Sequence, residues 1–268
     1  MVSLGLFVSV VSAAALCASA VQAEIRIGVA GPMTGPMAWG GEQFERGAAM
    51  AVADLNAKGG VLGQQVELIT VDDYCDPEQA VAAANKLVSD GVAFVAGHLC
   101  SHSSIAAAKV YEEAKTLMIN PGSAAAKLTD EGRPNVFRVN GRDDQQGAML
   151  GDYLSEHWPD KEIAILDDGT AWGAGVANAV RRRLRERGVS VTVDETFTPG
   201  EPEYSALVEK MQAAGVDVFL PGTLQREMGL IFRQARDRGY DLQLVSTSAG
   251  HYESFPLFAG PGSKARSW

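Results

Sequence analysis

The feature that most constrains this chain is a regular alternation, beginning at Ile25, of short runs rich in β-branched residues with longer amphipathic stretches. Short runs of this kind are typical of buried strands, and the longer stretches have the apolar period of helices. Repeated units of strand, helix and strand fold as a parallel sheet with helices on both faces. The expected strands are residues 25–30, 66–72, 93–96, 117–120, 136–139, 163–167, 189–195, 216–220 and 242–246.

The amphipathic stretches predict the helices that connect these strands. Asp76 is a natural N-cap for one of them, and Pro77 suits its first turn. The pattern restarts after the fifth strand, so we expect two lobes that meet near residues 140–144. That crossing contains no Pro/Ser-rich linker, which favours a hinge over a flexible tether. The expected helices are residues 42–58, 77–89, 101–114, 145–157, 175–187, 204–214 and 227–238.

Composition narrows the class of partner. Hydrophobic residues make up 46% of the chain, which is enough for a buried core. The formal net charge is -10, with 33 acidic against 23 basic residues. Such a surface repels phosphate backbones, so we expect no nucleic-acid partner and look instead to a small molecule or another protein.

The first 23 residues contain no charged side chain, and their apolar run is too short to span a bilayer comfortably. Val21 and Ala23 supply the small residues that a signal peptidase reads before a cleavage site. We therefore expect residues 1–23 to be a secretory signal peptide and the mature protein to be periplasmic.

Export affects the expected oxidation state of the three cysteines. If Cys17 is removed with the signal peptide, Cys75 and Cys100 remain as a pair in an oxidising compartment. An even pair in such a compartment is typical of one disulfide.

The segment GHLCSHSS, residues 97–104, admits interpretations that use reactive side chains. As a metal site, His98, Cys100 and His102 with Cys75 would offer zinc two sulfurs and two nitrogens. Alternate ligands at a junction between strand and helix would need an unusual backbone, which disfavours this site. As a nucleophile, Cys100 would use His98 or His102 as its base, and a disulfide would prevent that. We therefore expect no metal site and no catalytic residue.

A third interpretation of the same segment needs no reactive side chain. The segment follows a strand and begins a helix at Ser101, so the amides of the first turn lack carbonyl partners. Together with the hydroxyls of Ser101 and Ser103, they would hold a carboxylate at the carboxyl edge of the sheet. A serine that only caps its helix is the alternative.

Several motifs occur in the order found in a known family. The chain resembles the periplasmic leucine/isoleucine/valine-binding proteins, the type I solute-binding proteins of ABC importers. The resemblance implies two doubly wound lobes joined by a hinge, a Cys75–Cys100 disulfide, no cofactor, and a monomer that delivers a solute to a permease in the inner membrane. The motifs are MTGP (33–36), GAAMAVADLNAKGG (47–60), DDYCDPEQAVAAANKLVSDG (72–91), GHLCS (97–101), LMINPGS (117–123) and EMGLIFRQAR (227–236).

The resemblance also implies roles for individual residues. Ser101 would bind the ligand carboxylate through its hydroxyl and amide. The carbonyls of Leu99 and Gly122 would accept hydrogen bonds from the ligand ammonium. Trp172 would cover the ligand from the second lobe, and Trp39 would form a wall of the side-chain pocket.

Three positions depart from the family pattern. A threonine that helps to hold the carboxylate falls at Ala124, which leaves the backbone amide there, with Ser123 as a possible replacement hydroxyl. A pocket aromatic falls at Leu224. The acidic residue that pairs with the ammonium falls at Ser248.

The third departure bears on the ligand class. A hydrogen bond to a charged group contributes about 1.5 to 3 kcal/mol, so the change at Ser248 should weaken α-amino acid binding roughly ten- to a hundredfold. A carboxylate without an amino group, or a neutral amide, would suit such a site.

The C-terminal part raises a further expectation. Residues 254–262 still resemble the family and residues 263–268 do not, so we expect a truncated chain with an incomplete second half. The expected domains are the lobes 24–140 and 141–248, with residues 249–268 returning toward the first lobe. Missing segments would leave apolar surface exposed.

Two other functions fit parts of the sequence. A sensory or regulatory ligand-binding module would use the same fold. A dinucleotide-binding enzyme is prompted by Gly28, Gly31 and Gly35, but their spacing is not G-x-G-x-x-G, and Pro32 and Pro36 interrupt the turn.

Overall fold

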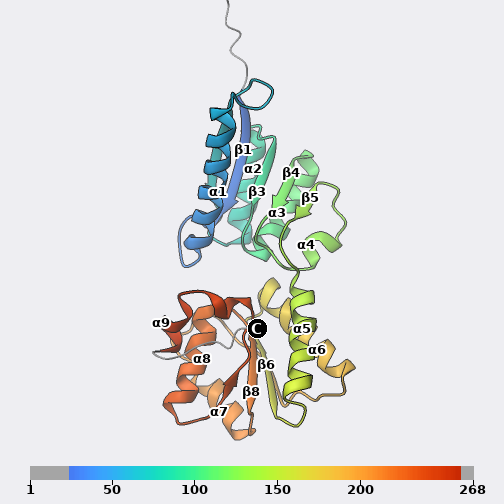
Figure 1. Ribbon diagram of the computed structural model, residues 1–268, viewed down its shortest axis with the longest axis vertical. Coiled ribbons are helices and arrows are strands. Elements are labelled where there is room, and N and C mark those ends of the chain that lie inside the picture. The colour runs from blue at the N-terminus through green and yellow to red at the C-terminus, as the bar shows by residue number, and fades with distance from the viewer. Residues whose placement is uncertain (1–23, 261–268) are drawn as a thin grey trace, which may run out of the picture.

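The computed structural model describes residues 24–260, which form two lobes stacked along the long axis of the molecule (Figure 1). The expected signal peptide and residues 261–268 lie outside this part. The first lobe contains β1 (Ile25–Gly31), α1 (Ala38–Ala57), β2 (Val66–Asp72), α2 (Pro77–Ser89), β3 (Phe94–Gly97), α3 (Ser101–Ala114), β4 (Leu117–Asn120), α4 (Lys127–Asp130) and β5 (Val136–Arg138).

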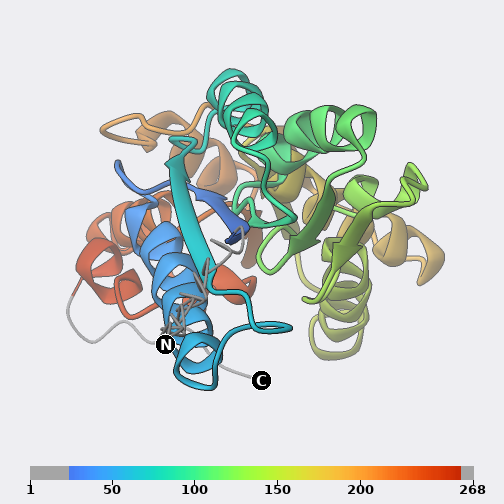
Figure 2. The same ribbon diagram turned by 90° about the horizontal axis from the view of Figure 1, so that it is seen from above.

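The first lobe is built on a parallel sheet with the strand order β2-β1-β3-β4-β5. Helix α1 lies on one face, and α2 and α3 lie together on the other (Figure 2). The core beneath α2 and α3 includes Leu87, Val95 and Met118, all fully buried. Asp76 caps α2 by accepting from the amides of Glu78 and Gln79. The expected strand and helix pattern of this lobe is confirmed.

The second lobe repeats the plan with the parallel strand order β7-β6-β8-β9. Its central strands β6 and β8 are buried along their whole length. The elements are α5 (Asp143–His157), β6 (Ile163–Asp167), α6 (Ala171–Glu186), β7 (Val193–Thr196), α7 (Ser205–Ala213), β8 (Val218–Gly222), α8 (Gln225–Asp237), β9 (Gln243–Leu244), the 3-10 helix η1 (Ser248–His251) and α9 (Phe255–Ala259).

Several element boundaries differ from those expected, and the starts of α6 and β7 are two of them. Helix α6 begins at Ala171, earlier than predicted, because the Thr170 hydroxyl accepts from the amide of Gly173 and caps the helix there. Strand β7 begins at Val193, later than predicted, because Val189 still bonds back to α6 and sheet pairing starts only at Val193.

Residues 249–260 contact both lobes, because the Tyr252 ring meets Trp39 of the first lobe and the following residues pack on the second. Phe255 and Ala259 are buried against Met228 of α8, so helix α9 packs on the second lobe. The approach is close at Gly229, where an added Cβ would lie 2.6 Å from the Cβ of Phe258. Helix α9 is therefore fixed to α8 by close packing.

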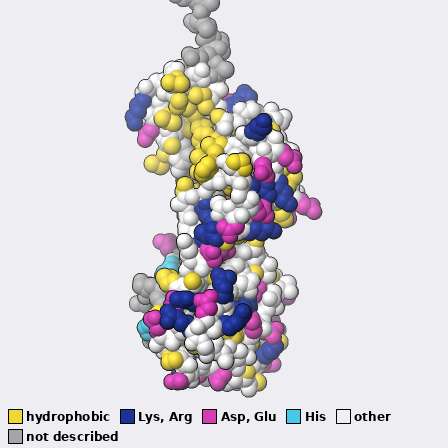
Figure 3. All heavy atoms as spheres, turned by 90° about the vertical axis from the view of Figure 1, so that its right-hand side faces the viewer, with side chains coloured by type: hydrophobic (Ala, Val, Ile, Leu, Met, Phe, Trp, Pro, Cys, Tyr) yellow, Lys and Arg dark blue, Asp and Glu magenta, His cyan; other side chains and the backbone are white. Residues whose placement is uncertain are grey.

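Apolar side chains are exposed on the first lobe. Met50 is 70% exposed, Phe137 54% and Val139 70%. Figure 3 shows hydrophobic side chains gathered along this lobe. On the second lobe, positively and negatively charged side chains are mixed. No helix within residues 24–260 has the length and hydropathy needed to cross a membrane.

We predict opposite effects for alanine at two helical glycines. Gly229→Ala should lower the free energy of unfolding by about 1 to 3 kcal/mol, because the new methyl group collides with α9. Gly47→Ala in α1 has open space around it and should raise that free energy by up to about 1 kcal/mol. Urea unfolding of both variants is the measurement. Equal effects would contradict the packing of α9 on α8.

Candidate functional site

A cavity of about 400 Å³ lies between the lobes and is lined by residues from both. Such a volume is ordinary for a small-molecule site. The cavity lies where the carboxyl ends of β3 and β4 face those of β6 and β8, the usual ligand position in open parallel sheets. Of the residues expected to bind ligand, those that line the cavity are Trp39, Leu99, Ser101, Gly122, Ala124, Trp172, Leu224 and Ser248.

Asn120, the last residue of β4, holds together the two first-lobe loops that reach the cavity. Its Nδ2 donates to the carbonyl oxygens of Gly97 at 2.9 Å and His98 at 2.8 Å. Its Oδ1 accepts from the amides of Gly122 at 3.1 Å and Ser123 at 2.7 Å. Because the Asn120 side chain is fully buried, water does not compete for these bonds.

Ser101 begins α3 and is almost fully buried at the cavity wall. Its Oγ accepts from the amide of Ala125 at 3.2 Å, so its own O–H is free to donate. The amides of the first helical turn have no intrahelical carbonyl to bind. Hydroxyl and amides together form a donor group suited to an anion.

The carbonyls of Leu99 and Gly122 each have one interaction within the first lobe. The Ser123 hydroxyl donates to the Leu99 oxygen at 2.9 Å, and the Asn140 amide donates to the Gly122 oxygen at 3.3 Å. A carbonyl oxygen has two lone pairs, so each can accept a second hydrogen bond.

Ser123 lies behind the cavity wall. It is 1% exposed, and its hydroxyl contacts Ser104 and the Leu99 carbonyl. It is therefore not placed to replace the hydroxyl that is absent at Ala124. Its contribution is to fix the Leu99 carbonyl.

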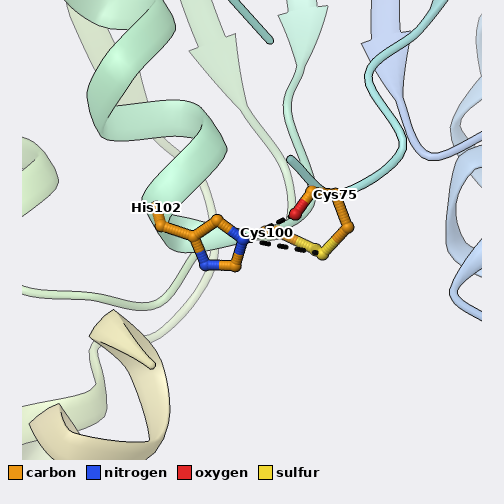
Figure 4. Close-up of side chains that lie close together, drawn as sticks. All are labelled: Cys75, Cys100 and His102. Atoms are coloured by element: carbon orange, nitrogen blue, oxygen red, sulfur yellow. Dashed lines mark hydrogen bonds between the residues drawn. A yellow bond between two sulfur atoms is a disulfide. The ribbon is translucent and has the colours of Figure 1, made fainter. Parts of the chain in front are cut away.

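Cys75 and Cys100 form a disulfide with a Cα–Cα distance of 5.4 Å (Figure 4). His102 lies beside it, with Nε2 2.6 Å from the carbonyl oxygen of Cys75. The three side chains are close enough to suggest a metal site. Both sulfurs are consumed by the disulfide, so neither can act as a thiolate ligand or a nucleophile.

His98 does not join this group. Its Nδ1 lies 2.6 Å from Oδ2 of Asp73, and its Nε2 lies 3.1 Å from the Tyr111 hydroxyl. All three side chains are fully buried in the first lobe. Burial raises the pKa of Tyr111, so its hydroxyl stays protonated and can donate to Nε2. The four candidate zinc ligands therefore do not converge.

Trp172 lies in the first turn of α6, and the Thr170 cap that starts this helix sets its position. Leu224, the N-cap of α8, and Ser248, the first residue of η1, complete the second-lobe wall. Trp172 and Leu224 also pack on the buried cluster of α8 and α9. The second-lobe side of the cavity therefore has an apolar section, formed by Trp172 and Leu224, next to polar side chains.

Two buried carboxylates that the sequence did not single out also line the cavity. Asp168 accepts from the Thr170 hydroxyl at 2.6 Å and the Thr223 hydroxyl at 3.0 Å, and Asp143 accepts from the amide of Ala126 at 3.1 Å. Burial raises the pKa of Asp168 and of Asp143. Asp168 directly follows a buried strand, and that position was the available signal.

The described chain crosses between the lobes at residues 139–142, beside the cavity. The Asp143 amide donates to the Ala124 carbonyl at 2.9 Å, and Arg142 bonds to Asp130 at 2.6 Å. The crossing is thus attached to the first-lobe loop that carries Ala124. The predicted hinge region directly adjoins the candidate site.

The dinucleotide motif is not supported by the first strand. Gly28 lies inside β1, where an added Cβ would meet Leu87 and Val95 at 3.0 to 3.1 Å. Close packing of β1 against its neighbours accounts for this glycine.

Comparisons with known proteins agree with this geometry. A family model described as a periplasmic binding protein matches residues 24–260. The leucine-, isoleucine-, valine-, threonine- and alanine-binding protein of Pseudomonas aeruginosa is 40% identical over 240 residues, which is 90% of this chain and 64% of that protein. A Leu/Ile/Val-binding protein homolog of Brucella abortus is 42% identical over 239 residues, with coverages of 89% and 64%. The chain thus spans less than two thirds of the length of these relatives.

Solved structures match as well. The LivJ substrate-binding protein of Streptococcus pneumoniae, in complex with isoleucine, aligns with a TM-score of 0.78 at 28% identity and covers 88% of this chain and 68% of its own. The leucine-binding protein LivK of Thermotoga maritima aligns with a TM-score of 0.81 at 26% identity, with coverages of 88% and 67%.

We predict that replacing Asn120 destabilises the first lobe. Asn120→Ala should lower the free energy of unfolding by roughly 3 kcal/mol, because buried carbonyls and amides lose their partners. Asn85→Ala, at an exposed amide on α2, is the matched control and should change it by less than about 0.5 kcal/mol. Equal losses in chemical denaturation would contradict the role given to Asn120.

The disulfide should contribute measurably to stability. Its cysteines are 25 residues apart. Closing a loop of this length stabilises a fold by roughly 3 kcal/mol, and the Cys75→Ala/Cys100→Ala variant should lose about that much. Non-reducing peptide mapping of the exported protein should recover the two cysteines in one linked pair. Alkylation of both thiols without reductant would contradict the pairing.

Proposed function

Since the chain belongs to the periplasmic binding protein family, we propose that it binds a small carboxylate-bearing solute in the cavity between its lobes. The solute is a branched-chain amino acid or a related small carboxylate or amide. The protein presents this solute, as a periplasmic monomer without a cofactor, to the inner-membrane permease of an ABC importer. Capture and delivery require no chemical step.

The donor group at the start of α3 is the observation that carries this proposal. Ser101 offers an uncommitted O–H beside the free amides of a helical first turn. A carboxylate placed there gains charge-assisted hydrogen bonds and the favourable field of the helix N-terminus. The disulfide and Asn120 hold the segment that carries these donors.

Charge on the second-lobe side supports one orientation of the ligand. Asp143 and Asp168 line the cavity and repel a carboxylate, while Arg142, which also lines it, is paired with Asp130 and Asp144. The carboxylate therefore points to the first lobe, and the rest of the solute lies against Trp172, Leu224 and Trp39. This wall favours an apolar side chain.

A direct test replaces Ser101. Ser101→Ala should weaken leucine and 4-methylpentanoate binding alike, by about ten- to a hundredfold, because both lose a hydrogen bond to the carboxylate. Ser103→Ala removes a buried hydroxyl of the same turn that does not line the cavity, and it serves as the matched control. Isothermal calorimetry measures the dissociation constants. Equal binding by the wild type and Ser101→Ala would refute the proposed carboxylate site.

A second test decides between ligand classes through Ser248. Without an acidic residue there, the amino group of leucine should contribute little, so leucine and 4-methylpentanoate should differ by less than about tenfold. Ser248→Glu should strengthen leucine binding about ten- to a hundredfold and should not strengthen 4-methylpentanoate binding.

Ser248→Gln, similar in size and uncharged, is the control for that experiment. Wild-type protein that prefers leucine by far more than tenfold would show that another group, with Asp168 and Asp143 as the candidates in the cavity, pairs with the ammonium.

A further inference from the structure

Two aromatic rings from different lobes meet at the cavity. Trp39 lies in the first turn of α1, and Tyr252 directly follows η1 in the second lobe. Their ring centroids are 4.7 Å apart at an interplanar angle of 54°, and both residues line the cavity. Helices α1 and α9 lie on the side of the molecule opposite the β5–α5 crossing (Figure 1). The ring contact therefore bridges the lobes across the cavity from the hinge.

Each ring is fixed to its own lobe. The Tyr252 carbonyl accepts from the Phe255 amide at 2.9 Å, and Phe255 is buried in the cluster beneath α9. Trp39 precedes Gly40 and Gly41, where an added Cβ would lie 2.4 Å from the Leu99 side chain and 2.1 Å from the Pro32 carbonyl, respectively. This close packing holds the start of α1 against the first lobe. Any hinge opening must consequently separate the two rings.

The contact between the two rings is favourable, but burying the indole N–H of Trp39 costs free energy. The Nε1 atom of Trp39 is buried and has no hydrogen-bond partner among residues 24–260. Burying an unpaired N–H costs more than a single aromatic pair usually gains. The ring pair alone therefore does not stabilise the closed arrangement, and apolar contact with a bound solute would add to it.

Tyr252 supplies the cavity with an aromatic ring that is absent at Leu224. The family resemblance places a pocket aromatic at Leu224, and this chain has an aliphatic side chain there. Tyr252 supplies an aromatic ring to the same cavity from a segment further along the chain. Its ring contacts that of Trp39 in the first lobe.

We propose that Tyr252 is a ligand-retention residue that closes, together with Trp39, over the apolar end of the solute and slows its release. The role follows from the position of the ring at the side of the cavity that hinge opening exposes. This inference rests on the proposed function, since it concerns a solute bound in the same cavity. It assigns specificity to side-chain size, because only a solute that reaches the two rings gains from their closure.

The test compares release rates in stopped-flow fluorescence, with leucine and alanine as probes. Tyr252→Ala should speed leucine release by about tenfold and change the association rate by less than about threefold. Alanine, whose side chain is shorter, should show a smaller acceleration. Tyr252→Phe keeps the ring and should release leucine at nearly the wild-type rate.

Glu253→Ala, an exposed neighbour that does not line the cavity, is the matched control. Equal leucine release by Tyr252→Ala and Glu253→Ala would overturn the retention role. Equal acceleration for leucine and alanine would also overturn it, because a general loosening of the fold has no dependence on side-chain size.

A second measurement separates this inference from the proposed function. Fluorine NMR of protein labelled with 5-fluorotryptophan, with the Trp39 signal assigned by Trp39→Phe, reports the ring contact itself. The Trp39 signal should differ between Tyr252→Phe and Tyr252→Ala. If neither leucine nor 4-methylpentanoate binds, the proposed function fails for these solutes. The fluorine signal then still shows whether the Trp39 and Tyr252 rings are in contact. Identical Trp39 signals in the two variants would overturn it.

Discussion

The buried amide of Asn120 is the interaction on which the candidate site depends. It accepts from one loop and donates to another, so the carboxyl ends of β3 and β4 are held as a single unit. The Leu99 carbonyl, the Gly122 carbonyl and the start of α3 all belong to that unit. None of these groups is chemically special alone. Their common orientation makes a site, because fixed backbone dipoles need no reorganisation when a charged ligand arrives.

The structure of residues 97–104 also explains why reactive side chains do not form the candidate site. The disulfide removes both thiols, His98 turns into the core toward Asp73 and Tyr111, and His102 is bonded to the Cys75 carbonyl. What remains at the cavity are a hydroxyl, backbone amides and carbonyls. Such groups bind and orient a solute. The second lobe adds aromatic and aliphatic surface together with two buried carboxylates, so the cavity offers both polar and apolar contacts to a solute.

Sequence patterns predicted most of the fold because strand and helix periodicity is local. Helix α3 and strands β2, β4 and β6 fall within the expected bounds. The boundary differences have local and distant causes: the Thr170 cap starts α6 earlier, and sheet pairing starts β7 only at Val193. Among site residues, those carried by a motif line the cavity, apart from Ser123. Tyr252 and Asp143 were missed because no local pattern distinguishes them from surface or capping residues, whereas the position of Asp168 directly after β6 was a usable signal.

The sequence by itself determined the parallel two-lobe architecture, the cysteine pair and the helix that starts at Ser101, because hydrophobic period, cysteine count and capping chemistry act over short stretches of chain. Tertiary structure alone decided which way each polar atom faces. It turned the Ser123 hydroxyl away from the cavity and toward Leu99, and it brought Tyr252 to Trp39 across more than two hundred residues of sequence. Such choices depend on close packing between distant segments, which no local pattern encodes.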